Sequence, residues 1–375
     1  MSKFLLVAGG LAAVLLLAAG CGASGSSGDG GSSSGARAIA VTITDDGCRA
    51  NPSKVPPGPA TFEVQNDGAD KVSEVELVSG NSILGEAEGV APGLSGKFSV
   101  TLKEGRFETY CPGADRERWP FVVAGGSGAQ GVSDAATASV RRYRSYLEAQ
   151  TALLVARTAA FTSAVRAGRL ADAKRLYVQA RIPYERIEPV AESFGSLDPA
   201  IDARAGDVPA AQWTGFHPME KAMWIKGTTG GLGVLASRLQ ADVKDLQRRV
   251  RRVKLEPAQI ANGSVELLGE VSKSKITGEE ERYSHTDLDD FEANVDGSRA
   301  AYASVRKFVA AEKPALAAEI DRRFEDVSKA LAPYRRGAGF VTYTALTTAD
   351  TRKLSQAIDA LAEPLSRVGA IVVTQ

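Results

Sequence analysis

The residues best suited to chemistry are His217 and Glu220, which stand three positions apart in the segment Gly-Phe-His-Pro-Met-Glu-Lys. On a helix, side chains at this spacing lie on one face, so an imidazole and a carboxylate could reach the same ion. That donor pair suits iron or zinc. Pro218, however, favours the first position of a helix, which would make His217 an N-cap and Glu220 its capping-box partner. The spacing alone leaves metal binding and helix capping open.

Two further segments concentrate carboxylates. Glu185 and Glu188 share one helical face at a spacing of three, and their like charges repel unless solvent or a cation intervenes. The run Glu279-Glu280-Glu281 lies shortly before His285, the only other histidine of the chain. A solvated acidic face and a charged helix entrance are the alternative interpretations of these two segments.

A third set of residues, in the N-terminal part of the chain, combines two cysteines with carboxylates. Cys48 and Cys111 would form a structural disulfide in an oxidising compartment. Glu74 and Glu76 stand two apart and share one face of a predicted strand, so these four residues are also candidates for a second, thiolate and carboxylate metal site. Both alternatives remain open from the sequence.

Composition excludes several kinds of protein. With two histidines in 375 residues, a three-histidine zinc centre is ruled out. Residues 38–125 contain neither His nor Met, which rules out a blue-copper centre of two histidines and a cysteine in that region. The 45 Lys and Arg residues balance 45 Asp and Glu residues, so the chain lacks the basic excess of a nucleic-acid binder.

The N-terminus is typical of an exported protein. An apolar run from Phe4 to Gly20 follows Lys3 and stops at Cys21, which predicts a signal peptide over residues 1–20. The segment from Leu17 to Cys21 resembles a bacterial lipobox, and that resemblance implies lipidation of Cys21. Residues 21–37 form a Gly/Ser-rich tether. We therefore expect an extracytoplasmic protein that is lipid-anchored to the cell membrane, on its periplasmic side or at the cell surface.

Two folded regions must position the candidate residues. Over residues 38–125, period-two alternation and Gly/Pro punctuation predict a small antiparallel β-sandwich with strands near 39–43, 60–64, 72–78, 96–102 and 121–123. Over residues 129–375, apolar stripes of helical period predict an up-and-down helix bundle. Its first helix is expected to start at Asp134 as N-cap and to end near Gly168, and further stripes lie within 232–253, 288–305, 316–331 and 354–368.

The β region resembles a cupredoxin-type domain. The residues that carry this resemblance are Cys48, the Pro57-Gly58 turn before Thr61-Phe62, Glu74 and Glu76, the segment 90–93 and the segment 107–111. The resemblance implies a cupredoxin-like sandwich, although the missing histidines exclude a conventional copper site.

The helical region resembles the imelysin-like domain of the EfeO family, on three motifs in order: Phe194–Asp202, the His-x-x-Glu of 215–220, and the run from Lys275 to Gly297. The resemblance implies a non-enzymatic iron-binding lipoprotein of an Efe-type uptake system, which captures iron and delivers it to a membrane permease. It places a metal site at His217 and Glu220, with Glu185, Glu188, Asp202 and Glu280 as companions. Fe²⁺ or Fe³⁺ is the implied ion, with copper or zinc as alternatives, and an iron permease and a haem peroxidase are the implied partners.

The competing function is that of an imelysin-like metallopeptidase. A zincin needs His-Glu-x-x-His, which supplies two imidazoles and a general base from one helix. No second histidine stands near His217. The sequence therefore favours metal binding over peptide hydrolysis.

Overall fold

The computed structural model describes residues 36–80, 82–125 and 133–375. The predicted signal peptide, Cys21 and the tether up to residue 35 lie outside these ranges. Gly35–Gln375 form one compact unit. No helix within the described ranges is long and apolar enough to cross a membrane.

The first part of the described chain is built of strands in two sheets. Their orders are β2-β1-β4-β7 and β3-β9-β8-β5-β6. The strands are β1 (Arg37–Thr44), β2 (Gly47–Asn51), β3 (Lys54–Val55), β4 (Gly58–Asn66), β5 (Val75–Ser79), β6 (Ser82–Ala87), β7 (Ser95–Leu102), β8 (Gly105–Tyr110) and β9 (Arg118–Val123).

The two sheets share one apolar core, to which both contribute alternate residues of their strands. Phe62 of β4 stacks on Phe98 of β7 at 4.8 Å between ring centroids and meets the edge of Phe121 of β9 at 5.4 Å. The other strand pairs of the two sheets are antiparallel as predicted, but β1 pairs with β4 and β3 with β9 in parallel, which the prediction did not include. Parallel partners are distant in sequence, so local alternation does not reveal them.

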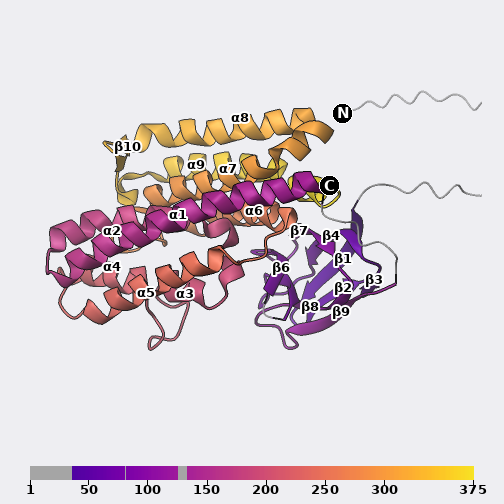
Figure 1. The fold of residues 1–375 in the computed structure, drawn as a ribbon, viewed down its shortest axis with the longest axis horizontal. Helices are drawn as coiled ribbons and strands as arrows, with labels where there is room; N and C mark the ends of the chain where they lie inside the picture. The colour runs from indigo at the N-terminus through magenta and orange to yellow at the C-terminus, as the bar shows by residue number, and fades with distance from the viewer. Residues whose placement is uncertain (1–35, 81, 126–132) are drawn as a thin grey trace, which may run out of the picture. The chain divides into compact units, whose positions relative to one another are not determined.

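The remainder is helical, which confirms the predicted order of a β region followed by a helical one (Figure 1). The helices are α1 (Asp134–Arg166), α2 (Leu170–Glu185), η1 (Glu188–Phe194), α3 (Leu197–Asp202), α4 (Phe216–Ile225), α5 (Gly233–Val250), α6 (Pro257–Lys273), η2 (Lys275–Thr277), α7 (Asp287–Glu312), α8 (Pro314–Leu331), η3 (Ala332–Tyr334), η4 (Tyr343–Ala345), α9 (Thr348–Leu365) and α10 (Val368–Val372). A short hairpin, β10 (Arg335–Arg336) and β11 (Gly339–Phe340), lies between η3 and η4.

The start of α1 differs by one residue from the prediction. Ser133, not Asp134, is the N-cap, and its hydroxyl accepts a hydrogen bond from the backbone N–H of Ala136 at 3.1 Å. Asp134 is the first helical residue, where its negative charge interacts favourably with the positive end of the helix dipole.

The helices bury two apolar clusters. One draws mainly on α1, α2, α4 and α5, and the other on α6, α7, α8, α9 and α10. Helix α1 packs on α2 and α5, while α9 packs between α6 and α8 (Figure 1). The buried charged residues described below come from α2, α4, η2, the segment before α7 and α7 itself, so they lie where the elements of both clusters meet.

Helix α6 also binds the β region through a side-chain amide. Asn262 accepts a hydrogen bond from the backbone N–H of Ser99 at 3.3 Å and donates one to the Ser99 carbonyl at 2.7 Å. Ser99 belongs to β7, the edge strand of the four-stranded sheet. The amide therefore satisfies both backbone groups of an edge residue.

Cys48 of β2 and Cys111, which follows β8, are joined in a disulfide with their Cα atoms 6.1 Å apart. Both cysteines are fully buried in the core of the β region. The bridge connects the two sheets, since β2 and β8 belong to different ones.

We predict that the double variant Cys48→Ala/Cys111→Ala loses about 2–5 kcal/mol of unfolding free energy, because the bridge restricts the unfolded chain over a long loop. Urea unfolding followed by circular dichroism measures the loss. Wild-type protein under reducing conditions serves as the control and should show a similar decrease. Identical unfolding of the wild type with and without reductant would contradict the prediction.

Candidate metal centre

Helix α4 begins at Phe216, so His217 and Glu220 both lie within it rather than at its cap. The N-cap is Gly215, whose φ of 87° and close approach to the Ile201 carbonyl leave no room for a side chain. Pro218 occupies the first turn, where its missing N–H costs no helical hydrogen bond. The interpretation of His217 as an N-cap was therefore wrong, and the spacing of three places both side chains on one buried face.

Glu220 fixes the orientation of the His217 imidazole. One of its oxygens lies 3.2 Å from His217 Nδ1. The other accepts hydrogen bonds from the backbone N–H groups of Tyr283 at 2.9 Å and Ser284 at 2.6 Å. With both oxygens engaged, Glu220 acts as the carboxylate partner that metal-bound histidines commonly have.

The other imidazole nitrogen points toward two carboxylates. His217 Nε2 lies 3.4 Å from Asp202 Oδ1 and 3.7 Å from Glu280 Oε1. Asp202 Oδ1 also pairs with Arg181, whereas His217 Nε2 has no hydrogen-bond partner. Buried polar atoms are rarely left without one, so Nε2 is the donor atom best placed to bind a cation together with these carboxylates.

A buried arginine lies at the centre of this cluster. Arg181 of α2 is fully buried, and its guanidinium forms ion pairs with five carboxylates. The partners are Glu185 at 2.5 Å, Glu281 at 2.8 Å, Glu280 at 3.0 Å, Asp290 at 3.3 Å, and Asp202. Removing one side of such a buried network leaves uncompensated charge, so Arg181 holds the acidic residues together.

A second buried cation, Lys275, forms ion pairs on the opposite side of the cluster. Its Nζ lies 2.6 Å from Glu188 Oε1, 3.1 Å from Glu185 Oε2 and 3.8 Å from Glu280 Oε2. Asn294 of α7 adds hydrogen bonds to the same two carboxylates, at 2.9 Å to Glu185 and 2.6 Å to Glu188. Glu185 and Glu188 therefore face protein cations, not solvent as the alternative interpretation of an acidic surface requires.

The cluster divides into carboxyls with opposite pKa shifts. Burial tends to raise the pKa of each, but Lys275, His217 and Arg181 hold the pKa of Glu280 well below its usual value. Burial prevails for Glu188, whose pKa is raised well above the usual value, and it raises the pKa of Glu281 to about 8. Near neutral pH some carboxyls therefore carry protons while Glu280 remains ionised, and binding of a metal ion is expected to release protons.

The six predicted bundle residues lie together: His217, Glu220, Glu185, Glu188, Asp202 and Glu280 all belong to this cluster. Arg181, Lys275, Glu281 and Asp290 were not predicted. Arg181 precedes Glu185 by four residues, a spacing that signals an ion pair on a helix but not its burial. His285 contributes to none of the ligand groups among the described residues.

Two groups of donors in the cluster have ligand atoms within 4.8 Å of one another: Asp202, His217 and Glu280, and His217, Glu220 and Glu281. In the second group Glu220 is bound to Nδ1 and to backbone N–H groups, and in the first group the oxygens of Asp202 and Glu280 nearest to His217 Nε2 are paired with Arg181, so a metal ion would compete with protein partners in either group. Two carboxylate oxygens with one imidazole nitrogen form a donor set that suits iron, zinc or manganese better than Cu(I).

The second predicted metal site, in the β region, differs in its residues from the prediction. Cys48 and Cys111 form the disulfide, so neither offers a thiolate. Glu74 instead gathers with Glu86 and Glu88 within 4.8 Å. Burial, together with Glu76, raises the pKa of Glu74 to about 7.

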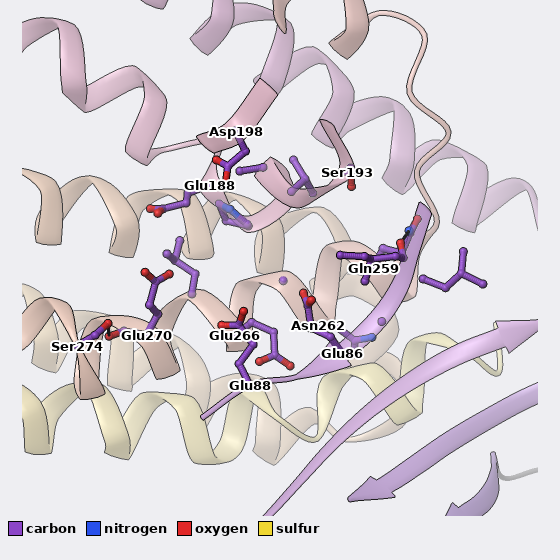
Figure 2. Close-up of a pocket in the computed structure, with 18 of the residues that line it drawn as sticks. Glu86, Glu88, Glu188, Ser193, Asp198, Gln259, Asn262, Glu266, Glu270 and Ser274 are labelled. Atoms are coloured by element: carbon purple, nitrogen blue, oxygen red, sulfur yellow. Dashed lines mark hydrogen bonds between the residues drawn. The ribbon is translucent and has the colours of Figure 1, made fainter. Parts of the chain in front are cut away.

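A cavity of about 390 Å³ adjoins the buried cluster. Figure 2 shows the acidic side chains that line it, contributed by β6, η1, α3 and α6. Burial and the nearby carboxylates of Glu280 and Glu88 raise the pKa of Glu270 on α6 to about 7, against the effect of Lys275.

The chain is similar in sequence to known proteins. The family model for imelysin, Peptidase_M75, matches residues 139–368. The iron uptake system component EfeO of Escherichia coli strain K12 is 39% identical over 342 residues, which cover 89% of this chain and 91% of that protein. EfeO of Shigella flexneri matches to the same extent, and that of Escherichia coli O1:K1 is 38% identical over the same shares.

One solved structure supports the fold. A crystal structure described as that of an iron-regulated protein A precursor from Parabacteroides distasonis aligns with a TM-score of 0.54 at 17% identity. The alignment covers 66% of this chain and 97% of that one.

The substitution Arg181→Met keeps most of the length of the side chain and removes its charge. We expect it to lower the unfolding free energy by about 3–5 kcal/mol at pH 7, because the buried carboxylates lose their positively charged partner. The matched control is Arg175→Met on the same helix, since Arg175 is exposed and pairs only with Asp172 among the ion pairs of the described residues. Urea denaturation measures both. Equal effects of the two substitutions would contradict a central role for Arg181.

The imidazole of His217 should give a pH-dependent stability in metal-free protein. Burial lowers its pKa, but the contacts with Glu220 and Glu280 outweigh burial and raise it to about 9. A raised folded-state pKa stabilises fully below the unfolded value of 6.5, and the stabilisation is lost as pH rises through about 9. The unfolding free energy of the wild type minus that of His217→Asn should thus be larger at pH 6 than at high pH. A difference that is constant or grows with pH would contradict this assignment.

Proposed function

Since the chain belongs to the imelysin family and, within it, to the EfeO group of iron uptake system components, we propose that it captures iron outside the cytoplasm and delivers it to a membrane permease. The observation that carries the proposal is the convergence of His217 Nε2, Asp202 Oδ1 and Glu280 Oε1. Iron is the cargo, as Fe²⁺ or Fe³⁺, and zinc and copper are the competing ions.

The remaining predicted residues surround this triad in supporting roles. Glu220 orients His217, while Glu185 and Glu188 carry the charge that Lys275 now balances. Carboxylate oxygens are hard ligands, and their excess over nitrogen favours iron over softer ions. Because an incoming ion competes with protons, iron affinity should fall as the pH drops.

We propose a non-catalytic role despite the peptidase-like name of the family. Hydrolysis by a zincin requires a second imidazole and a glutamate general base on the helix of the first histidine. Helix α4 carries His217 alone. Glu220, the acid nearest in sequence, is bound to Nδ1 and two backbone N–H groups and is not free to act as a base.

Three further features belong to the same proposal. The chain is extracytoplasmic and is anchored through a lipid on Cys21. Its partners are the permease and a haem peroxidase of the uptake system. Residues 38–125 form a cupredoxin-like domain and residues 129–375 an imelysin-like domain within the compact unit, and Glu74 with its neighbours in the first domain handles metal before or after the bundle site.

Iron titration of His217→Asn tests the bundle site. We expect an affinity loss of at least ~10–100-fold, the range seen when even an outer-shell partner of a metal ligand is removed. His285→Asn is the matched control, and Asn is chosen because it tolerates the positive φ of 58° at His285. Isothermal titration with Fe²⁺ under anoxic conditions and with Fe³⁺ citrate measures both variants.

Unchanged iron affinity in a folded His217→Asn variant would refute the bundle site. Absence of iron binding by the wild type in both oxidation states would refute the capture function itself. Cleavage of unfolded peptides that depends on His217 would establish the peptidase alternative instead.

A further inference from the structure

The carboxylate of Glu188 belongs to both the cluster and the neighbouring cavity. Its side chain is 15% exposed, against 10% for Asp202 and 4% or less for Glu185 and Glu280. On the inner side its oxygens meet Lys275 Nζ at 2.6 Å and the Asn294 amide at 2.6 Å. On the outer side it lines the cavity, close to Glu270 in Figure 2.

A second residue that lines the cavity also contacts the buried cluster. Arg204 lines the cavity, and its Nη1 lies 3.3 Å from Oε2 of Glu280. The other oxygen of Glu280 is one of the three donors assigned to the metal. Two cavity-lining residues, Glu188 and Arg204, therefore contact the buried cluster directly.

The lining of the cavity favours cations. Six carboxylate residues line it against one cationic residue, Arg204: Glu86, Glu88, Glu188, Asp198, Glu266 and Glu270. In Figure 2 these side chains follow one another from the β6 side toward η1, with Glu270 near Glu188. A concave surface with an excess of acidic groups attracts cations and speeds their association.

On the premise that the bundle site binds iron, we propose that this cavity is the passage through which the metal cation reaches the cluster, and that the ammonium of Lys275 closes its inner end. A cation that arrives at Glu188 meets carboxylates already paired with Lys275. Entry is therefore an exchange, in which the metal ion takes over oxygens of Glu188 and Glu185 as the ammonium withdraws. No covalent bond or electron transfer is involved.

A passage and a ligand predict different kinetics. Narrowing a passage slows association and dissociation by the same factor and leaves Kd unchanged, whereas removing a ligand changes Kd. Ser193, an exposed residue of the cavity lining, offers a place to narrow it. We expect Ser193→Trp to slow both rates by about tenfold at an affinity equal to that of the wild type.

Stopped-flow fluorescence with iron, in whichever oxidation state the wild type binds, measures association, and competition with a chelator measures dissociation. Ser237→Trp, at an exposed position of α5 outside the cavity lining, is the matched control and should leave both rates unchanged. Wild-type rates in the folded Ser193→Trp variant would overturn the passage. A variant that changes Kd with an unchanged association rate would also overturn it.

Two substitutions of glutamate by glutamine test whether the acidic lining of the cavity speeds the association of iron. Glu270→Gln should lower the association rate about two- to tenfold at low salt, and this loss should shrink as ionic strength rises. Glu148→Gln on the exposed surface of α1 is its control. Equal rates for the two variants at low salt would overturn the role of Glu270.

Lys275→Gln tests the closing ammonium. Because the metal no longer displaces a charged group, the variant should bind iron faster than the wild type, while Lys275→Arg should stay close to it. A folded Lys275→Gln variant with slower or unchanged association would overturn this step. Failure of the wild type to bind iron would refute the proposed function, whereas normal binding with unaltered rates in the cavity variants would refute only the passage.

Discussion

The arrangement of the helical region depends on the burial of one guanidinium among carboxylates. Arg181 on α2 meets acids that come from α2 itself, from α3, from the segment before α7 and from α7. Taking these charges out of water is costly, and the cost is offset only when every partner is held in place. The helices must therefore meet at one relative position, which also brings His217 Nε2, Asp202 and Glu280 within reach of one ion.

This interaction explains how a strongly acidic cluster can stay folded without a bound metal ion. Arg181, Lys275 and a protonated His217 supply positive charge, and burial raises the pKa of Glu188 and, to about 8, that of Glu281. In the proposed role the site must release the iron that it captures, and it is suited to exchange because protons and side-chain ammonium groups can return to the carboxylates when the ion leaves.

Much of the fold could be predicted from the pattern of the chain, because alternation in strands such as β1 and β4 and apolar stripes in α5, α7 and α8 record burial directly. Strand β3 is two residues long, and the parallel pairing of β1 with β4 is non-local, so neither leaves a local signal. In the site, the spacing of His217 and Glu220 made them candidate ligands but left helix capping open, and the family resemblance favoured the metal site. Arg181 and Lys275 were missed because such residues are usually exposed, and their burial depends on tertiary partners.

The hydrogen bonds of the Asn262 amide affect how the β region can contact other molecules. Strand β7 ends its sheet, and an open edge can recruit a strand from another molecule. Asn262 occupies the N–H and the carbonyl of Ser99 in the middle of that edge, and Gly369 of α10 packs close to the same residue. The helical region thus shields this edge of the β region from edge-to-edge aggregation.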